Sequence, residues 1–157
     1  MKREQVIAAT RDWLGTPYHH MARKKGQGVD CGQLIIAGFV DAGAVEDFKT
    51  GYYTPDWHLH RGEEKYLGFI EAHLARVDDD DRSIDARLAN DASWHAPAGD
   101  VIVFRVGRTF SHGGIVSSWP MFIHSYLPSG IVEEVDIRNT PMSRRPARVY
   151  TFEGYER

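Results

Sequence analysis

Cysteine occurs only once in this chain of 157 residues, and no apolar run approaches the length that crosses a membrane. A single cysteine excludes an internal disulfide and any zinc site built from several cysteines. The net charge is -3, with 19 Lys and Arg against 22 Asp and Glu, and it gives no reason to expect nucleic acid as a partner, because surfaces that bind phosphates need clustered cations. The one basic stretch, residues 138–148, is interpreted as a solvated loop leading into a last strand. We therefore expect neither a nucleic-acid partner nor insertion into a membrane.

The N-terminal segment, residues 1–5, lacks the hydrophobic core of a secretion signal. We therefore expect the protein to be made in the cytoplasm without a signal peptide. Hydrophobic residues make up 42% of the chain, which is enough for one sizeable core. The length fits a single domain over residues 1–157.

Apolar residues recur at helical spacing in the first half of the chain, at residues 3–14, after Asp30 as far as Gly43, and at residues 63–74. Residues 45–61 show no clear period and are expected to form a loop. From residue 98 onward, β-branched and aromatic runs between turn signals predict strands at 101–106, 112–118, 121–126, 130–136 and 147–153. Helices followed by an antiparallel sheet indicate the α+β class.

The cysteine lies in the segment Gly28-Val29-Asp30-Cys31-Gly32-Gln33-Leu34, where a polar loop runs into a helical pattern. Asp30 is a good N-cap and Gln33 follows at the third helical position, so the helix is predicted to begin at Cys31. The unpaired N–H groups and the dipole of a helix start favour a thiolate over a thiol. We therefore expect a reactive thiol whose pKa lies below the ordinary cysteine value of about 8.5. The alternative is a small buried side chain with a structural role.

Histidines lie on two neighbouring predicted strands, His112 in Ser111-His112-Gly113-Gly114-Ile115 and His124 in Phe122-Ile123-His124-Ser125-Tyr126. Side chains alternate between the two faces of a sheet. Two antiparallel strands therefore place His112 and His124 on one face if the numbers of paired residues add up to an even value. A turn centred on Trp119 meets this condition. A thiol nucleophile would then have a histidine as base and a third polar side chain that holds the imidazole. Gly113 and Gly114 leave room beside the base for a substrate or the helix end. The alternative is two ordinary half-buried strand residues.

The other histidines raise the alternative of a metal site. His58 and His60 would share a face on a strand, and His19 and His20 are adjacent. Neither pair has a carboxylate at the spacing of a known metal motif, so we expect no metal. The acidic run at residues 78–81 is expected to be exposed, and it lacks the spacing and the glycine of a calcium-binding loop.

Blocks along nearly the whole chain resemble the NlpC-type cell-wall cysteine peptidases: Gly15-Thr16-Pro17-Tyr18, Gly28-Val29-Asp30-Cys31, Gly99-Asp100-Val101-Ile102-Val103-Phe104, Ser111-His112-Gly113-Gly114-Ile115 and Ile123-His124-Ser125. The resemblance implies a papain-like α+β fold, in which N-terminal helices, one carrying the nucleophilic cysteine, pack on a C-terminal antiparallel sheet. It also implies hydrolysis of amide bonds in peptidoglycan stem peptides, commonly beside D-glutamate and a diamino acid. Its catalytic residues fall on Cys31, His112 and His124, and it implies no metal or organic cofactor.

Candidate substrate-binding residues border these catalytic positions. The tyrosine of the family, which lies close to the thiolate and the substrate carbonyl, falls on Tyr18. Asp30 is expected to cap the helix, and its carboxylate is also a candidate for binding a substrate amine. Ser111, which directly precedes the base, is the third candidate.

Within the family, residues 16–20 and 25–31 are most similar to members encoded with phage tail genes or gene transfer agents. This implies phage tail proteins as further partners and incorporation into a tail or similar particle. The chain departs from the family in two respects. Gly32-Gln33 follows the cysteine, where the family usually has a small residue and then glycine. The stretch between Cys31 and His112 is also longer than in compact members of the family. Residues 44–95 are therefore expected to contain an extra helix and a loop that shape the cleft.

Two alternatives to a wall hydrolase remain open from the sequence. The first is a catalytically inactive structural protein of tail assembly with the same fold. The second is a thiol amidase or acyltransferase that acts on a substrate other than the cell wall.

Overall fold

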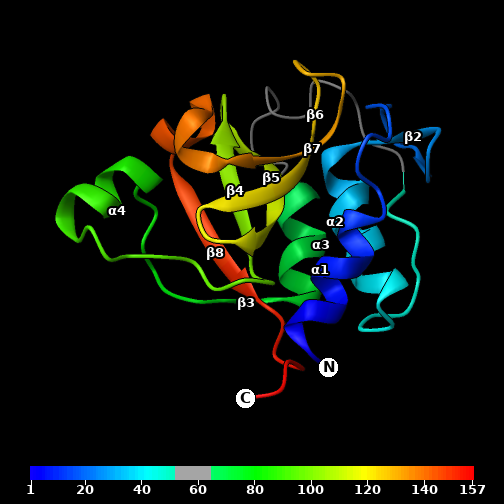
Figure 1. The fold of residues 1–157 in the computed structure, drawn as a ribbon, viewed down its shortest axis with the longest axis horizontal. Helices are drawn as coiled ribbons and strands as arrows, with labels where there is room; N and C mark the ends of the chain where they lie inside the picture. Colours follow the sequence, from blue (N-terminus) through cyan, green and yellow to red (C-terminus); the bar gives the residue numbers. More distant parts are fainter. Residues whose placement is uncertain (52–64) are drawn as a thin grey trace.

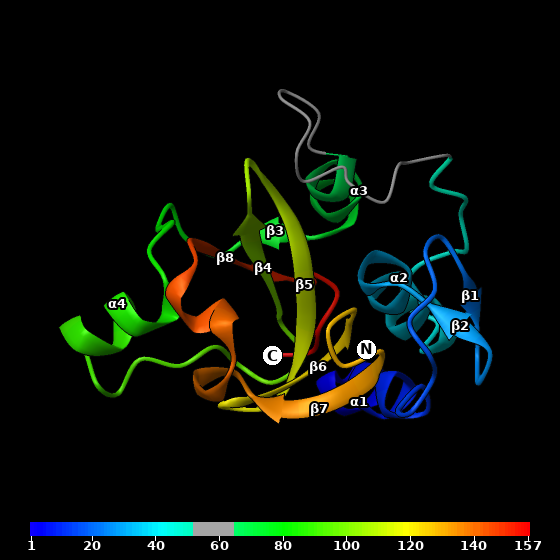
Figure 2. The same cartoon turned by 90° about the horizontal axis from the view of Figure 1, so that it is seen from above.

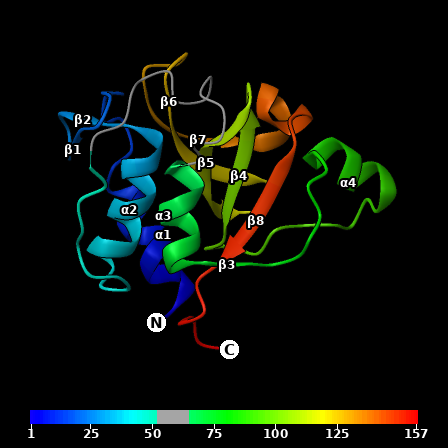
Figure 3. The same ribbon diagram turned by 180° about the vertical axis from the view of Figure 1, so that it is seen from behind.

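The computed structural model describes residues 1–51 and 65–157, in which an antiparallel sheet packs against helices (Figure 1). Helices α1 (Arg3–Arg11), α2 (Cys31–Asp41) and α3 (Lys65–His73) lie together on one side of β4 and β5 (Figure 3). The short helix α4 (Ile84–Asn90) lies on the other side (Figure 2). The described strands of the sheet run in the order β3-β8-β4-β5-β6-β7, with bounds Ala75–Arg76 (β3), Val101–Val106 (β4), Thr109–Ser118 (β5), Met121–Tyr126 (β6), Ile131–Asp136 (β7) and Ala147–Thr151 (β8).

This architecture confirms the predicted α+β class, with N-terminal helices packed on a C-terminal antiparallel sheet. Strands β4 and β6 have the predicted bounds, and β5, β7 and β8 each differ from the prediction at one end only. The segment predicted as a helix at residues 63–74 contains α3 in its described part. The predicted loop at residues 45–61 is irregular as far as residue 51, and the rest of it lies outside the described residues.

Several short elements are absent from the sequence prediction. Helix α4 is too short to show a helical period, although its start carries the usual signal, since Ser83 Oγ accepts a hydrogen bond from the Ala86 N–H (3.1 Å). Two further strands, β1 (Arg23–Lys24) and β2 (Gly28–Val29), pair directly before α2.

The interpretation of residues 138–148 as a solvated loop is wrong in part. They include the 3₁₀ helix η3 (Pro141–Arg144), which follows η2 (Ile137–Asn139) and buries Met142 and Ser143. Met142 belongs to the core on the face of the sheet away from α2, so this segment covers apolar surface that the strands leave exposed.

Alternation along the strands divides the core between the two faces of the sheet. Toward the helices, Val101, Val103 and Ile115 pack with residues of α2 and α3. On the opposite face, Ile102, Phe104, Val116 and Phe122 pack with Ile84 of α4 and with η2 and η3. Because both faces are covered, the strands are apolar on both faces, and β5 is buried over nearly its whole length.

The register of the β5–β6 hairpin places its alternate residues as predicted. Ile115 lies opposite Ile123 and Val116 opposite Phe122, which are pairs with an even residue sum. His112 and His124 therefore share one face. Gly113 and Gly114 make room for protein rather than for substrate: a Cβ atom on Gly113 would lie 2.7 Å from the Tyr66 hydroxyl, and one on Gly114 would lie 2.5 Å from the Phe122 ring.

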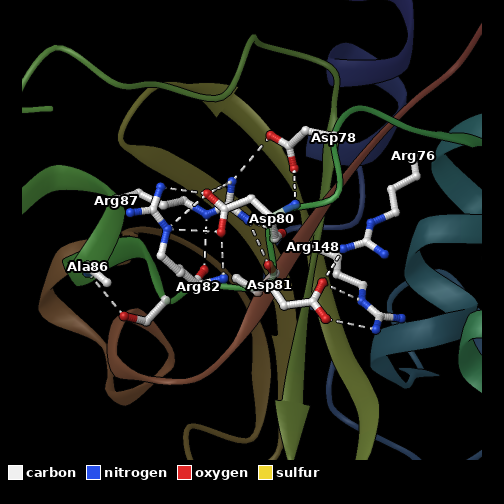
Figure 4. A network of polar contacts seen from close by, with 10 residues as sticks. Arg76, Asp78, Asp80, Asp81, Arg82, Ala86, Arg87 and Arg148 are labelled. Atoms are coloured by element: carbon white, nitrogen blue, oxygen red, sulfur yellow. Dashed lines mark hydrogen bonds and ion pairs between the residues drawn. The ribbon is translucent and has the colours of Figure 1, made fainter. Parts of the chain in front are cut away.

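The acidic run at residues 78–81 is largely exposed, as expected, and it binds arginines (Figure 4). Arg87 of α4 is 1% exposed and donates to the carbonyls of Arg82 (3.0 Å), Asp80 (2.6 Å) and Ala147 (2.8 Å). Its guanidinium also lies 3.6 Å from the Asp80 carboxylate. This buried cation therefore attaches α4 and the acidic segment before it to strand β8.

No helix among the described residues is long and apolar enough to cross a membrane.

Candidate active site

Cys31 is the first residue of α2, and Asp30 caps the helix as predicted. Asp30 Oδ1 accepts a hydrogen bond from the Gln33 N–H (2.8 Å), and Oδ2 accepts one from the Met21 N–H (2.8 Å). Asp30 is only 2% exposed, so the structure gives its carboxylate a clear role in holding the helix start. Binding of a substrate amine by Asp30 stays a prediction.

The sulfur of Cys31 lies against strand β5, where it contacts the backbone of the two residues that flank His112. Its thiol donates to the carbonyl of Ser111 (3.6 Å), and the backbone of Gly113 forms a hydrogen bond to the sulfur. The backbone of Gly32 and the hydroxyl of Tyr66 also form hydrogen bonds to it. The candidate nucleophile on α2 and the strand that carries the candidate base are therefore brought together from segments far apart in the sequence.

The expectation of a thiol with a lowered pKa is wrong for this structure. Burial raises the pKa of Cys31, and the nearby Asp30 carboxylate raises it further, while the hydrogen bonds to the sulfur lower it by less. Cys31 is 5% exposed because α3 covers the helix start: a Cβ atom on Gly32 would lie 3.0 Å from the Phe69 ring. The helix dipole contributes at most about 2 kcal/mol, which is less than the cost of removing a charge from water.

His112 and His124 form a hydrogen-bonded pair, with His112 Nε2 2.8 Å from His124 Nδ1. Both are buried, at 8% and 0% exposure. Burial lowers the pKa of His112 well below its ordinary value, and repulsion from the positive charge of Arg145, and from His124 when that ring is protonated, lowers it further. Burial also lowers the pKa of His124, to about 3. Both imidazoles are therefore neutral at pH 7, which is the state in which His112 can accept a proton.

Comparison with solved structures places this arrangement in a known fold. The NlpC/p60 domain of the peptidoglycan hydrolase SagA superposes with a TM-score of 0.60 at 15% identity, over 95% of this chain and 98% of that domain. The fold is that of the NlpC/p60 domains. NlpC1 from Trichomonas vaginalis matches with a TM-score of 0.59 at 19% identity, over 96% of this chain but only 43% of its own length.

A further structural neighbour is an N-acetylmuramoyl-L-alanine amidase from Bacteroides uniformis. Its TM-score is 0.57 at 13% identity, over 96% of this chain and 98% of the amidase. No protein-family model and no curated protein matches the sequence. The likeness therefore lies in the fold, and the papain-like arrangement predicted from the sequence motifs is confirmed.

Within the NlpC/p60 fold, two candidate substrate-binding residues lie at the candidate nucleophile, Cys31. Tyr18 is half-buried, and burial raises its pKa, as do the charges of Cys31 and Asp30, so its hydroxyl stays protonated and can donate. Ser111 is buried, and its hydroxyl donates to the carbonyl of Thr109 (3.3 Å), whereas its own carbonyl contacts the thiol. Substrate binding by either residue stays a prediction.

Two residues near the catalytic groups are missing from the sequence prediction. Tyr66 reaches the thiol from α3, which no motif links to the cysteine. Glu133 lies 3.4 Å from His124 Nε2. Glu133 could have been found from the sequence, because the predicted strands at 121–126 and 130–136 are consecutive and their antiparallel pairing places Glu133 opposite His124.

Among the described residues, no group of three or more histidine, cysteine or carboxylate side chains is arranged to hold a metal ion. His19 Nδ1 contacts the carbonyl of His20 (3.1 Å). His58 and His60, the other pair considered as metal ligands, lie outside the described residues.

Proposed function

We propose that this protein is a cysteine peptidase or amidase that hydrolyses amide bonds in peptidoglycan stem peptides. One observation carries the proposal: a cysteine at a helix start contacts the backbone on both sides of His112, whose imidazole is held by His124 at 2.8 Å. This is the geometry of a nucleophile, a base and a group that orients the base.

The reaction begins from a neutral thiol and a neutral imidazole. The Cys31 proton moves to His112 as the sulfur attacks the substrate carbonyl, because the raised pKa of the thiol disfavours a free thiolate in the resting site. In the resting structure the thiol donates to the Ser111 carbonyl, so the sulfur must turn toward His112 when a substrate binds. Backbone N–H groups at the start of α2, together with the Tyr18 hydroxyl, donate to the oxyanion.

Collapse of the tetrahedral intermediate breaks the C–N bond. The amine leaves with the proton that His112 has taken from Cys31, and a thioester remains on the sulfur. Water then attacks the thioester, with His112 as the base, and releases the acid and the free thiol. The substrate class is supported by the neighbours of known structure, which include a peptidoglycan hydrolase and an N-acetylmuramoyl-L-alanine amidase.

Digestion of purified peptidoglycan and of defined muropeptides tests this function. The parent protein should release new amino groups, and mass spectrometry should identify one cleaved amide bond. Cys31→Ala should release none while keeping its circular dichroism spectrum, because the two side chains are similar in size. Equal digestion by the parent and by Cys31→Ala would overturn the proposal.

The burial of the thiol favours a second candidate, an inactive structural protein of the same fold. That candidate predicts no release of amines from any wall preparation. A thiol amidase or acyltransferase with another substrate predicts acylation of Cys31 by small activated esters but no wall digestion. The three functions therefore give different results in the same pair of assays.

We also propose that the protein acts in a phage tail or a similar particle. This proposal rests only on the resemblance of residues 16–20 and 25–31 to members encoded with tail genes. Mass spectrometry of purified particles from the producing strain should detect the chain. Its absence from such particles would contradict this part.

A further inference from the structure

The hydrogen bonds that hold His112 continue beyond His124 to a carboxylate. His124 Nδ1 lies 2.8 Å from His112 Nε2, and His124 Nε2 lies 3.4 Å from Glu133 Oε2. Glu133 is directly opposite His124 in the pairing of β6 with β7. Its side chain is 22% exposed, whereas His124 is fully buried, so these side chains link the base to the protein surface.

The carboxylate determines which nitrogens carry protons. A carboxylate can only accept a hydrogen bond, so His124 Nε2 must carry the proton of its ring. Since burial keeps the imidazole neutral, His124 Nδ1 is an acceptor, and His112 Nε2 must donate to it. Nδ1 of His112 is then left with a free lone pair, which can take the proton of Cys31.

The opposite arrangement of protons would disable the base. If His124 carried its proton on Nδ1, it would donate to His112 Nε2, and the neutral His112 would carry its own proton on Nδ1. His112 would then have no free lone pair on Nδ1 for the thiol proton. The distances between the rings would be unchanged, so the difference lies only in the tautomers.

We propose that Glu133 is a positioning residue that fixes the tautomers of His124 and His112. Its effect on turnover rests on the proposed function, because turnover depends on these tautomers only if His112 is the base. The tautomers themselves exist in the resting protein and can be measured without any substrate.

The surroundings of the pair leave this task to Glu133. Tyr126 stacks on His124 with ring centres 4.8 Å apart, and Phe122 packs beside it at 4.4 Å. These contacts set the ring plane but not the position of the proton. Among the described residues, the other charged groups that act on this site are Arg145, whose positive charge lowers the pKa of His112, and Asp30, whose negative charge raises the pKa of Cys31.

Glu134, the next residue of β7, is a matched control. Its side chain is also 22% exposed, but it lies opposite Ile123 and forms an ion pair with Arg11 of α1 (3.0 Å). Substitution of either glutamate makes the same change of charge on the same strand. Of these two glutamates, only Glu133 contacts His124.

The experiment measures the tautomers by long-range ¹H–¹⁵N NMR on protein labelled at histidine nitrogen, with His112 and His124 assigned by substitution. In the parent protein, Nε2 should be protonated in both rings. Glu133→Gln should keep this pattern, since its amide oxygen can still accept. Glu133→Lys can only donate, and it should move the protons of both rings to Nδ1, whereas Glu134→Lys should change neither.

Glu133→Met supplies the result if the lysine variant does not fold, because it keeps the volume without a donor or an acceptor. Its spectra should show a mixture of both tautomers. A proton on Nδ1 of His124 in the parent protein would overturn the proposal. Parent tautomers in folded Glu133→Lys or Glu133→Met would overturn it too.

Turnover of a muropeptide gives the second readout. Glu133→Lys should lower kcat on the order of a hundredfold with little change in KM, since the base and not substrate binding is affected. Glu133→Gln and Glu134→Lys should stay within a few-fold of the parent. If the parent protein digests no wall substrate, the proposed function fails, while the nitrogen spectra still decide the role of Glu133.

Discussion

Cys31 is subject to two opposing effects at the start of α2. The dipole and the N–H groups favour a thiolate, but α3 covers the sulfur and removes it from water. Removal from water dominates, so burial raises the pKa of the thiol. The resting site is therefore a neutral thiol beside a neutral imidazole, and its reactivity depends on the access of reagents and substrate.

Alkylation of Cys31 by iodoacetamide should be slow in the native protein at pH 7 and should accelerate above pH 9, because the raised pKa keeps the thiol protonated. Phe69→Ala should speed the reaction by removing part of the cover over Gly32. Phe152→Ala is the control, because it also removes a phenyl ring, but one that packs beside Phe39 and Tyr155. This variant should leave the rate unchanged. Rapid alkylation of the folded parent at pH 6 would contradict this prediction.

His124 contacts His112 through Nδ1, and this decides which substitution preserves its role. Asn places its side-chain oxygen near the position of Nδ1, so His124→Asn should retain more activity than His124→Gln. His124→Ala should lose on the order of a hundredfold in kcat through misorientation of His112. Turnover of muropeptides measures the order, and equal activity of all the variants would show that His124 does not orient the base.

At the scale of elements, α4 is held by a polar contact more than by its own propensity. It has seven residues, which is too few for an isolated helix to be stable. Arg87 ties it to β8 through the carbonyl of Ala147, and Ile84 enters the core on that face of the sheet. This anchored helix completes the covering of the second face, where η3 also packs.

Arg87→Ala should destabilise the protein by about 3–5 kcal/mol, because it leaves the carbonyl groups of Arg82, Asp80 and Ala147 without their donor and removes one of the two arginines that pair with the Asp80 carboxylate. Arg82→Ala removes an exposed ion pair with the same Asp80 and should have a much smaller effect. Urea unfolding of both variants measures the difference. Similar unfolding midpoints would show that Arg87 does not hold α4.

At the scale of the whole molecule, folding transfers the two histidines of the pair into a closed core between strands and aromatic rings. Both have a lower pKa in the folded protein than in the unfolded chain. The unfolded chain therefore binds more protons below about pH 6.5, and the free energy of unfolding must decrease as the pH falls through that value. The stability of the fold is thus linked to the neutral state of the candidate base.

Between pH 7 and pH 5 the free energy of unfolding should fall by about 2 kcal/mol for each of these histidines. The window lies above the range in which the carboxylates paired with arginine, such as Asp80 with a pKa of about 2, take up protons. Urea unfolding at pH 7, 6 and 5 measures the slope, and His124→Asn should reduce it by about half. A free energy of unfolding that stays constant over this window would contradict buried neutral histidines.

The sequence by itself determined the class of the fold, the helix start at Cys31 and the common face of His112 and His124. These features depend on local signals, namely a cap residue, the alternation of side chains and the length of a turn, which are encoded within a few neighbouring residues. Glu133 was within reach of the same reasoning, because it lies opposite His124 in strands whose bounds were predicted.

Only the tertiary structure decided the protonation state of the candidate nucleophile, Cys31. The thiol pKa depends on what covers the sulfur, and the cover comes from Tyr66 and Phe69, more than thirty residues away along the chain with no periodic relation to Cys31. The burial of Arg87 and of Met142 was decided in the same way, by contacts between distant segments. Removal of a titratable side chain from water depends on all the residues that pack around it. A short stretch of sequence shows the titratable side chain itself, but it does not show which distant residues will cover it.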